Sequence, residues 1–310
     1  MARGLVFKGR RIYARIRQGV KSEPGYFTLA ECEISGLVIA MPMTPKNRTR
    51  EGVNLKLTLA YDGGPYVGWQ RQALGVSVQQ RLEEALQKIA GTRVVAHGAS
   101  RTDTGVHALG MVVSFHWPSA RLEPSKLQRA LNALLPEDIR VLKLQRARAD
   151  FHARFEARWK LYRYRILNAP VADPFRRKVT WFIHPPLDLT AMQQATRRLV
   201  GEHHFASMAV NPGYSRSSMA RHIRRCEVIC RRACPPFVGN EIHVEVEGNS
   251  FLYKMVRTMV GTLVEVGLGK RTPESIRDLI RSRDRKLAGK TAPAHGLFLV
   301  RVFYSHLVVE

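Results

Sequence analysis

The chain has 310 residues, of which 45% are hydrophobic, and its formal net charge is +25. This length accommodates two ordinary domains with sizeable cores, and no apolar run is long enough to predict a membrane-spanning helix. The excess of lysine and arginine, which is spread along the whole chain, indicates a polyanionic partner, nucleic acid above all.

Residues 1–50 differ from the rest of the chain. They contain no acidic residue before Glu23 and no hydrophobic pattern that would build a core. We therefore expect a basic N-terminal extension that is poorly ordered. The alternatives are a transit peptide, although a sustained amphipathic pattern is missing, and a start codon that lies at Met41 or Met43.

The first half of the remaining chain alternates between strand and helix patterns. Apolar residues with period two predict strands, and apolar residues three or four apart predict helices, the first of which has Ser77 as its N-cap. In chain order we expect a strand at 55–61, a helix at 76–89, strands at 92–96 and 109–115, a helix at 124–135 and a strand at 139–144. This order is that of the ferredoxin-like fold.

The second half follows a looser version of the same order. We expect a strand at 161–167, a helix at 189–200, strands at 222–231 and 241–248, helices at 251–266 and 273–282, and a strand at 297–303. The predicted fold class is therefore α+β. Two ferredoxin-like α/β halves, residues 54–150 and 151–305, join their antiparallel sheets around a central basic cleft, and the extension 1–50 precedes them.

Residues 97–108 form a polar, glycine-containing loop between two expected strands. Asp103 is its single carboxylate, with Arg101 two residues before it and His107 four residues after it. Loops held by a rigid scaffold commonly carry chemistry. The alternative is a turn aspartate that only hydrogen-bonds its own backbone.

Two further segments have compositions that suit RNA binding or a charged site. Residues 151–164 interleave aromatic rings with cations, which suits stacking on bases and contact with phosphates, unless Tyr162 and Tyr164 simply face a core. Arg257 lies within an apolar helical pattern, where a guanidinium is costly to bury unless it is paired. The alternative is that its long side chain reaches solvent.

Four cysteines in a chain of this size do not indicate a disulfide framework and fit a reducing cytoplasm. The equal spacing of Cys226, Cys230 and Cys234 suggests a metal site, but no fourth ligand lies at a familiar zinc spacing. We expect no metal, and we expect Cys226 and Cys230 to be buried or half-buried on one face of a strand.

The string Arg-Thr-Asp-Thr-Gly-Val-His-Ala at 101–108 resembles the signature loop of the tRNA pseudouridine synthase A family, with Thr104 where the family usually has alanine. Segments 61–71, 151–164, 251–261 and 295–299 resemble further family motifs in the same order. The resemblance implies that Asp103 is the nucleophile and that Arg257 pairs with it. It also implies that Tyr162 lies against the target uracil and that Leu297 belongs to the strand that walls the uracil pocket.

The family resemblance implies isomerisation of uridine to pseudouridine at positions 38 to 40 of the tRNA anticodon arm. The target base must be flipped out of its stem, and Arg101 would fill the gap that it leaves. We expect no cofactor, no membrane, tRNA as partner, a homodimer and a cytoplasmic location. Two alternatives stay open: an RNA-binding module without catalysis, and a pseudouridine synthase for a different RNA.

Overall fold

The structure is a computed structural model. It describes residues 52–304 except 120, 122, 212, 214–217 and 233–237, and in the N-terminal part the short segments 4–7, 10–13, 31–34 and 37–40. The chain divides into two compact units, Met1–Glu51 and Gly52–Glu310. The second unit contains every candidate site residue.

In the first unit the described residues form two pairs of strands. β1 (Gly4–Phe7) pairs with β2 (Arg10–Tyr13), and β3 (Glu31–Ile34) pairs with β4 (Leu37–Ala40), both antiparallel. The other residues of 1–51 lie outside the described part of the chain, so a poorly ordered extension stays a prediction.

The first half of the second unit has the strand order of the ferredoxin-like fold. The sheet order is β8-β5-β7-β6, in which all neighbours are antiparallel. The elements are β5 (Val53–Tyr61), α1 (Val78–Ala90), β6 (His97–Gly98), β7 (His107–Trp117), α2 (Pro124–Leu134) and β8 (Ile139–Arg146). Burial alternates along β5, and Ser77 caps α1 by accepting a hydrogen bond from the Gln80 N–H, as predicted.

The strand expected at 92–96 is the one wrong strand prediction in this half, because only His97 and Gly98 pair as β6. Helix α1 satisfies the backbone of Ala96 instead. The Glu83 carboxylate accepts from the Ala96 N–H at 3.1 Å, and the Gln79 amide donates to the Ala96 carbonyl at 3.0 Å.

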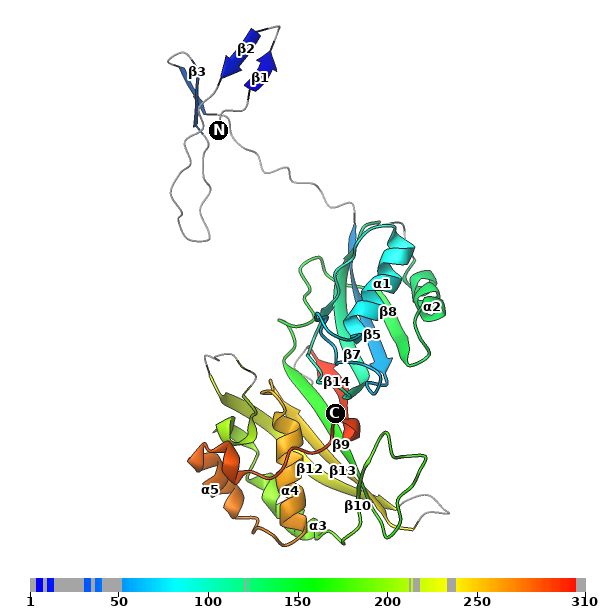
Figure 1. Cartoon of the computed structure of the whole chain (residues 1–310), viewed down its shortest axis with the longest axis vertical. Helices are drawn as coiled ribbons and strands as arrows, with labels where there is room; N and C mark the ends of the chain where they lie inside the picture. Colours follow the sequence, from blue (N-terminus) through cyan, green and yellow to red (C-terminus); the bar gives the residue numbers. More distant parts are fainter. Residues whose placement is uncertain are drawn as a thin grey trace. The chain divides into compact units, whose positions relative to one another are not determined.

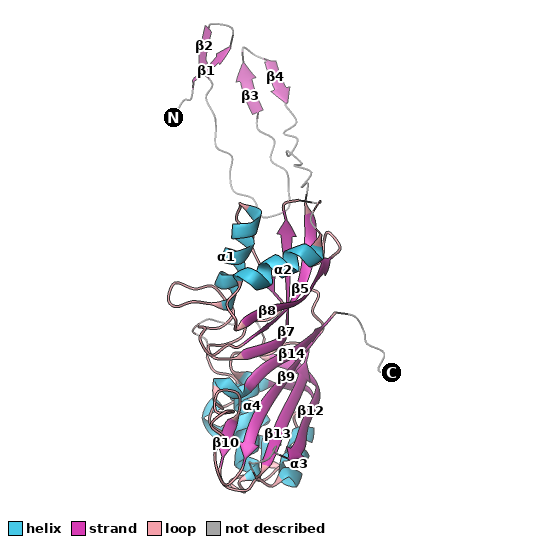
Figure 2. Ribbon diagram, turned by 90° about the vertical axis from the view of Figure 1, so that its right-hand side faces the viewer, coloured by secondary structure: helices cyan, strands magenta, loops and turns pink. Residues whose placement is uncertain are grey.

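The second half repeats the same strand order, β14-β9-β13-β12, and joins the first half where β14 pairs in parallel with β7 at Leu299 and Ala108. A continuous ten-stranded, mostly antiparallel sheet results (Figures 1 and 2). The elements are β9 (Trp159–Asn168), β10 (Trp181–Ile183), α3 (Leu189–Arg197), β11 (Gly201–His204), η1 (Phe205–Met208), β12 (Ala220–Arg232), β13 (Asn240–Gly248), α4 (Met255–Gly267), α5 (Ser275–Ser282), η2 (Arg285–Leu287), η3 (Ala294–Gly296) and β14 (Leu297–Phe303).

The sequence prediction was wrong at the start of α4, which begins at Met255 rather than at residue 251. Lys254 has φ 57° and ψ 11°, the left-handed conformation, so residues 251–254 turn away from the helix axis. A non-glycine residue in this conformation costs energy and is common at functional sites.

The cysteine prediction holds for one position and fails for another. Cys226 is buried, whereas Cys230 is exposed near the end of β12, and Cys234 lies outside the described residues. Within the described part of the chain no group of three or more histidine, cysteine or acidic residues could hold a metal ion. No described helix is long and apolar enough to cross a membrane.

Candidate active site

A cavity of about 1070 Å³ opens between the two halves of the second unit, and all five site residues predicted from the sequence line it. Residues from α1 and α4 and side chains of β9 and β14 share its wall, so both helices lie on the same face of the sheet. Among the described residues that line it, Asp103 is the single carboxylate, against the six cations Arg101, Arg154, Lys160, Arg221, Lys254 and Arg257. Such a lining attracts a polyanion.

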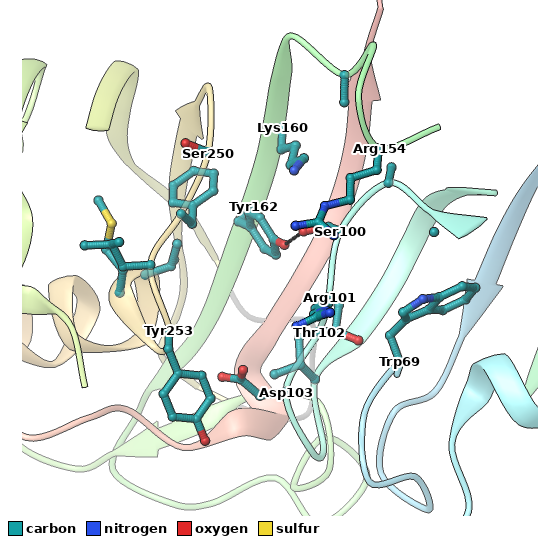
Figure 3. A pocket seen from close by; sticks show the side chains of 18 of the residues that line it. Trp69, Ser100, Arg101, Thr102, Asp103, Arg154, Lys160, Tyr162, Ser250 and Tyr253 are labelled. Carbon is teal, nitrogen blue, oxygen red and sulfur yellow. Dashed lines mark hydrogen bonds between the residues drawn. The ribbon is translucent and has the colours of Figure 1, made fainter. Parts of the chain in front are cut away.

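Asp103 lies at the start of a tight turn. The Val106 N–H donates to the Asp103 carbonyl at 3.1 Å, and Gly105 has φ 76°, which few other residues adopt at low cost. The turn fixes the Asp103 backbone, and the Asp103 side chain, which is 22% exposed, points into the cavity (Figure 3). Asp103 can therefore stabilise the turn through its backbone and still present its carboxylate to a substrate.

Arg257, 154 residues along the chain, forms an ion pair with Asp103. Its Nη1 lies 3.3 Å from Asp103 Oδ2, and its Nε donates to the Ala292 carbonyl at 2.8 Å. Burial raises the pKa of Asp103, while Arg257 and Lys254 oppose that rise. The pairing implied by the resemblance is thus present. The net pKa of Asp103 nevertheless remains above its ordinary value.

Tyr162 projects from β9 into the same cavity. It is 5% exposed, its hydroxyl lies 2.9 Å from Ser100 Oγ, and its ring packs edge-on against Phe251 with centroids 5.1 Å apart. Burial raises the pKa of Tyr162 to about 12, so its hydroxyl is a neutral phenol at neutral pH. Tyr164, two residues along, is fully buried and donates to the Pro293 carbonyl, so it belongs to the core.

Arg101 and Leu297 complete the predicted set. Arg101 is exposed at the cavity rim and has no hydrogen-bond or ion-pair partner among the described residues, so its guanidinium is available to a ligand. Leu297, at the start of β14, is the register partner of Tyr164 and is 5% exposed. Its apolar side chain adds to the cavity wall.

Aromatic rings also gather among the residues that line the cavity. His97 and His152 have ring centroids 5.0 Å apart, and His152 and Phe155 have centroids 4.2 Å apart. Phe155 is 77% exposed. An exposed ring beside cations is a surface on which nucleic-acid bases stack, so part of the 151–164 segment has the placement that RNA binding requires.

The 61–71 segment is hydrogen-bonded to the Asp103 loop at Thr102. The Trp69 N–H donates to the Thr102 carbonyl at 3.1 Å, and the Tyr61 hydroxyl lies 2.7 Å from Thr102 Oγ1. Gly68 has φ 100°, and a Cβ there would lie 2.4 Å from the Thr102 carbonyl oxygen. The segment is therefore structural at these positions, and the close approach at Gly68 leaves no space for a side chain.

His107 does not reach the cavity. It is 2% exposed, its Nδ1 accepts from the Gly63 N–H at 3.1 Å, and its Nε2 lies 3.1 Å from the His295 carbonyl. The Asp62 Oδ1 lies 3.0 Å from His107 Nδ1, and burial lowers the pKa of His107 although this carboxylate opposes the shift. His107 thus connects β7 to the segment that precedes β14.

Sequence reasoning did not single out three cavity residues: Ser100, Lys160 and Lys254. Ser100 holds the Tyr162 hydroxyl, and Lys254 helps to keep the Asp103 carboxylate ionised. Lys160 lies within the aromatic and cationic 151–164 segment, which was the one available signal. The left-handed turn at Lys254 had no signal in the sequence, because lysine is not typical of that conformation.

Comparison with known proteins shows the family to which this chain is similar. The family model described as tRNA pseudouridine synthase matches residues 58–156 and 195–305. Proteins named tRNA pseudouridine synthase A are similar: the one from Thermoanaerobacter sp. (strain X514) is 40% identical over 253 residues, and the one from Brevibacillus brevis (strain 47 / JCM 6285 / NBRC 100599) is 43% identical over 250 residues. Each match covers 81% of this chain and 99% of the relative.

A solved structure titled "Crystal Structure of a Cbf5-Nop10-Gar1 Complex" aligns with 82% of this chain and 49% of its own, with a TM-score of 0.32 and 14% identity. That likeness is too weak to carry a conclusion. The match of the family model over most of the chain, together with the curated relatives, is decisive: the chain belongs to the tRNA pseudouridine synthase family.

Proposed function

We propose that this tRNA pseudouridine synthase acts at positions 38, 39 and 40 of the tRNA anticodon stem-loop, with Asp103 as the nucleophile on a flipped-out uridine. The resemblance of residues 101–108 to the family's signature loop supports the substrate position. The observation that carries the mechanism is the Asp103 carboxylate, held by Arg257 at 3.3 Å in a cavity whose other charged lining residues, among those described, are cations.

The reaction is an isomerisation in which no atom is gained or lost overall. The C1′–N1 bond breaks, the uracil turns, and a C5–C1′ bond forms, while C5 loses a proton and N1 gains one. Asp103 acts by covalent catalysis through attack on C1′ or C6, or by assisting a glycal-type intermediate. The raised pKa of Tyr162 leaves little phenolate at neutral pH, so Tyr162 assists loss of the C5 proton as a hydrogen-bonding group and not as the base that accepts it.

The uridine must leave its helical stem to reach Asp103. In our proposal the exposed Arg101 enters the gap in the stem, Tyr162 lies against the extruded uracil, and Leu297 walls the pocket. An anion among cations weakens the binding of RNA, so Asp103 has no evident purpose in a module that only binds RNA. This argument favours the enzyme over the binding module.

The direct test is to incubate the protein with unmodified tRNA and to map pseudouridine along it. We expect modification at positions 38 to 40, and loss of each signal when that uridine alone is replaced by cytidine. Pseudouridine that appears only elsewhere in tRNA would refute the proposed position, and tight binding with no pseudouridine at all would favour the binding module.

Two substitutions at Tyr162 separate the ring from the hydroxyl. We expect Tyr162→Phe to bind tRNA productively, because the ring remains, and Tyr162→Leu to bind it about tenfold less well, because stacking on a base contributes about 1–3 kcal/mol. Single-turnover kinetics at varied enzyme concentration distinguishes binding from chemistry. Equal binding by the two variants would rule out the stacking role.

Gly68→Ala tests the support of the Asp103 loop. The added Cβ must displace the Thr102 carbonyl, and a shift of about 1 Å at a reacting group can reduce the rate by about 100-fold. We expect that loss in the single-turnover rate, with the protein still folded. Gly64→Ala is the matched control, because its Cβ would meet only the Asp62 side chain. Equal rates in the two variants would contradict the prediction.

The family resemblance also leads us to propose a homodimer in the cytoplasm. Analytical ultracentrifugation of the full chain, with and without tRNA, tests the oligomeric state. A monomer at micromolar concentration under both conditions would refute it.

A further inference from the structure

Lys160 is a half-buried cation that the mechanism above does not use. Its side chain lines the cavity, yet it forms no hydrogen bond and no ion pair within the described residues. Burial, together with the neighbouring Arg154, lowers the pKa of Lys160 to about 8. An uncompensated amine at this depth costs stability, and such costs concentrate at functional sites.

The position of Lys160 relative to Asp103 follows from β9. Tyr164, Tyr162 and Lys160 alternate along the strand and so share one face. The Asp103 end lies toward Tyr164, because the Tyr164 hydroxyl donates to the Pro293 carbonyl and the preceding Ala292 carbonyl accepts from Arg257, the ion-pair partner of Asp103. Lys160 lies two residues beyond Tyr162 in the other direction, about 6.6 Å along the strand.

The Lys160 end of the cavity is lined by hydrogen-bond donors. Arg154 extends toward Ser100 and Tyr162 (Figure 3), and Ser250 lines the same cavity. Arg154 is the charged neighbour that acts on Lys160, and the other charged and titratable groups that line the cavity are His97, Arg101, Asp103, His152, Tyr162, Arg221, Tyr253, Lys254 and Arg257. No carboxylate lines this end among the described residues, since Asp103 is the single one in the cavity.

We propose that Lys160, with Arg154, binds a phosphate that flanks the extruded uridine, and so holds the backbone while Tyr162 holds the base. The inference rests on the proposed function. A phosphate is the fitting ligand, because it is an anion that accepts several hydrogen bonds and is joined to the uridine by its own ribose. Lys160 is thus a substrate-positioning residue, and it is distinct from the nucleophile and from the residues that contact the base.

A double-mutant cycle tests the contact. The substrate is a tRNA anticodon stem-loop that carries an uncharged methylphosphonate at the phosphate on either the 5′ or the 3′ side of the target uridine, and the protein is unmodified or carries Lys160→Gln. We expect Lys160→Gln to raise the Kd for the natural RNA about tenfold, as loss of a charge-assisted hydrogen bond does. At one flanking phosphate the methylphosphonate should produce the same loss, and the two changes together should cost no more than either alone.

Lys88→Gln is the matched control, because Lys88 is exposed in the last turn of α1 and does not line the cavity. It should change the Kd less than twofold. Fully additive effects at both flanking phosphates, or a Lys160→Gln protein that binds like the Lys88→Gln protein, would overturn the inference. Failure of the unmodified protein to form pseudouridine would instead refute the proposed function.

The pH dependence of binding provides a second readout. The amine must be protonated to bind phosphate, so the affinity of the unmodified protein should fall as pH rises above about 8. Lys160→Arg stays charged throughout and should bind with little change over the same range. A Lys160→Arg protein that keeps the full pH dependence of the unmodified protein would overturn the assignment to Lys160.

Discussion

We expect Asp103→Asn to reduce pseudouridine formation by about 10⁴-fold or more, the scale of loss when a nucleophile is removed. Asparagine has nearly the same size and leaves the main-chain turn at Val106 intact, but its amide cannot attack carbon. Binding of tRNA should be as tight as in the unmodified protein, or tighter. The reason is that the substitution removes the one carboxylate among the described residues that line a cationic cavity.

Two measurements make this result interpretable. The single-turnover rate at saturating tRNA reports the chemistry, and a filter-binding Kd reports the affinity. Thermal unfolding is the control, because Arg257 loses its ionic partner and some loss of stability is expected. A folded Asp103→Asn protein with a rate within tenfold of the unmodified protein would eliminate Asp103 as the nucleophile.

Arg257→Gln should reduce the rate by about 100-fold at neutral pH, comparable to losing one preorganised group at a reacting centre. Arg257 opposes the burial that raises the pKa of Asp103. Removing it raises that pKa further, so the fraction of ionised Asp103 falls, most of all at low pH. The acid limb of the pH–rate profile should therefore move to higher pH, and the deficit should shrink as pH rises.

Arg271→Gln is a close control for this experiment. Arg271 pairs with Glu265 of α4 at 2.9 Å and also donates to a backbone carbonyl, as Arg257 does, but it lies outside the cavity. Its loss should affect stability and leave the pH–rate profile unchanged. If Arg257→Gln lowers the rate equally at every pH, Arg257 does not act on the ionisation of Asp103.

Local patterns predicted the elements well where the physical cause is local. The alternation in β5 and the Ser77 cap of α1 depend on neighbours within one or four residues, and both predictions are confirmed. Prediction failed where distant groups decide. The backbone of Ala96 is bound by side chains of α1 and not by a strand, and residues 251–254 turn away from the helix axis and line the cavity.

The sequence by itself determined the chemical inventory of this protein: a basic chain, the motif around Asp103, and the family in which that motif is found. Only the tertiary structure decided how those groups act on one another. Asp103 and Arg257 are 154 residues apart, and the pairing of β14 with β7 brings the two halves together around one cavity. The pKa of Asp103 and the uncompensated charge of Lys160 depend on burial, and burial is a property of the packed chain that no local pattern encodes.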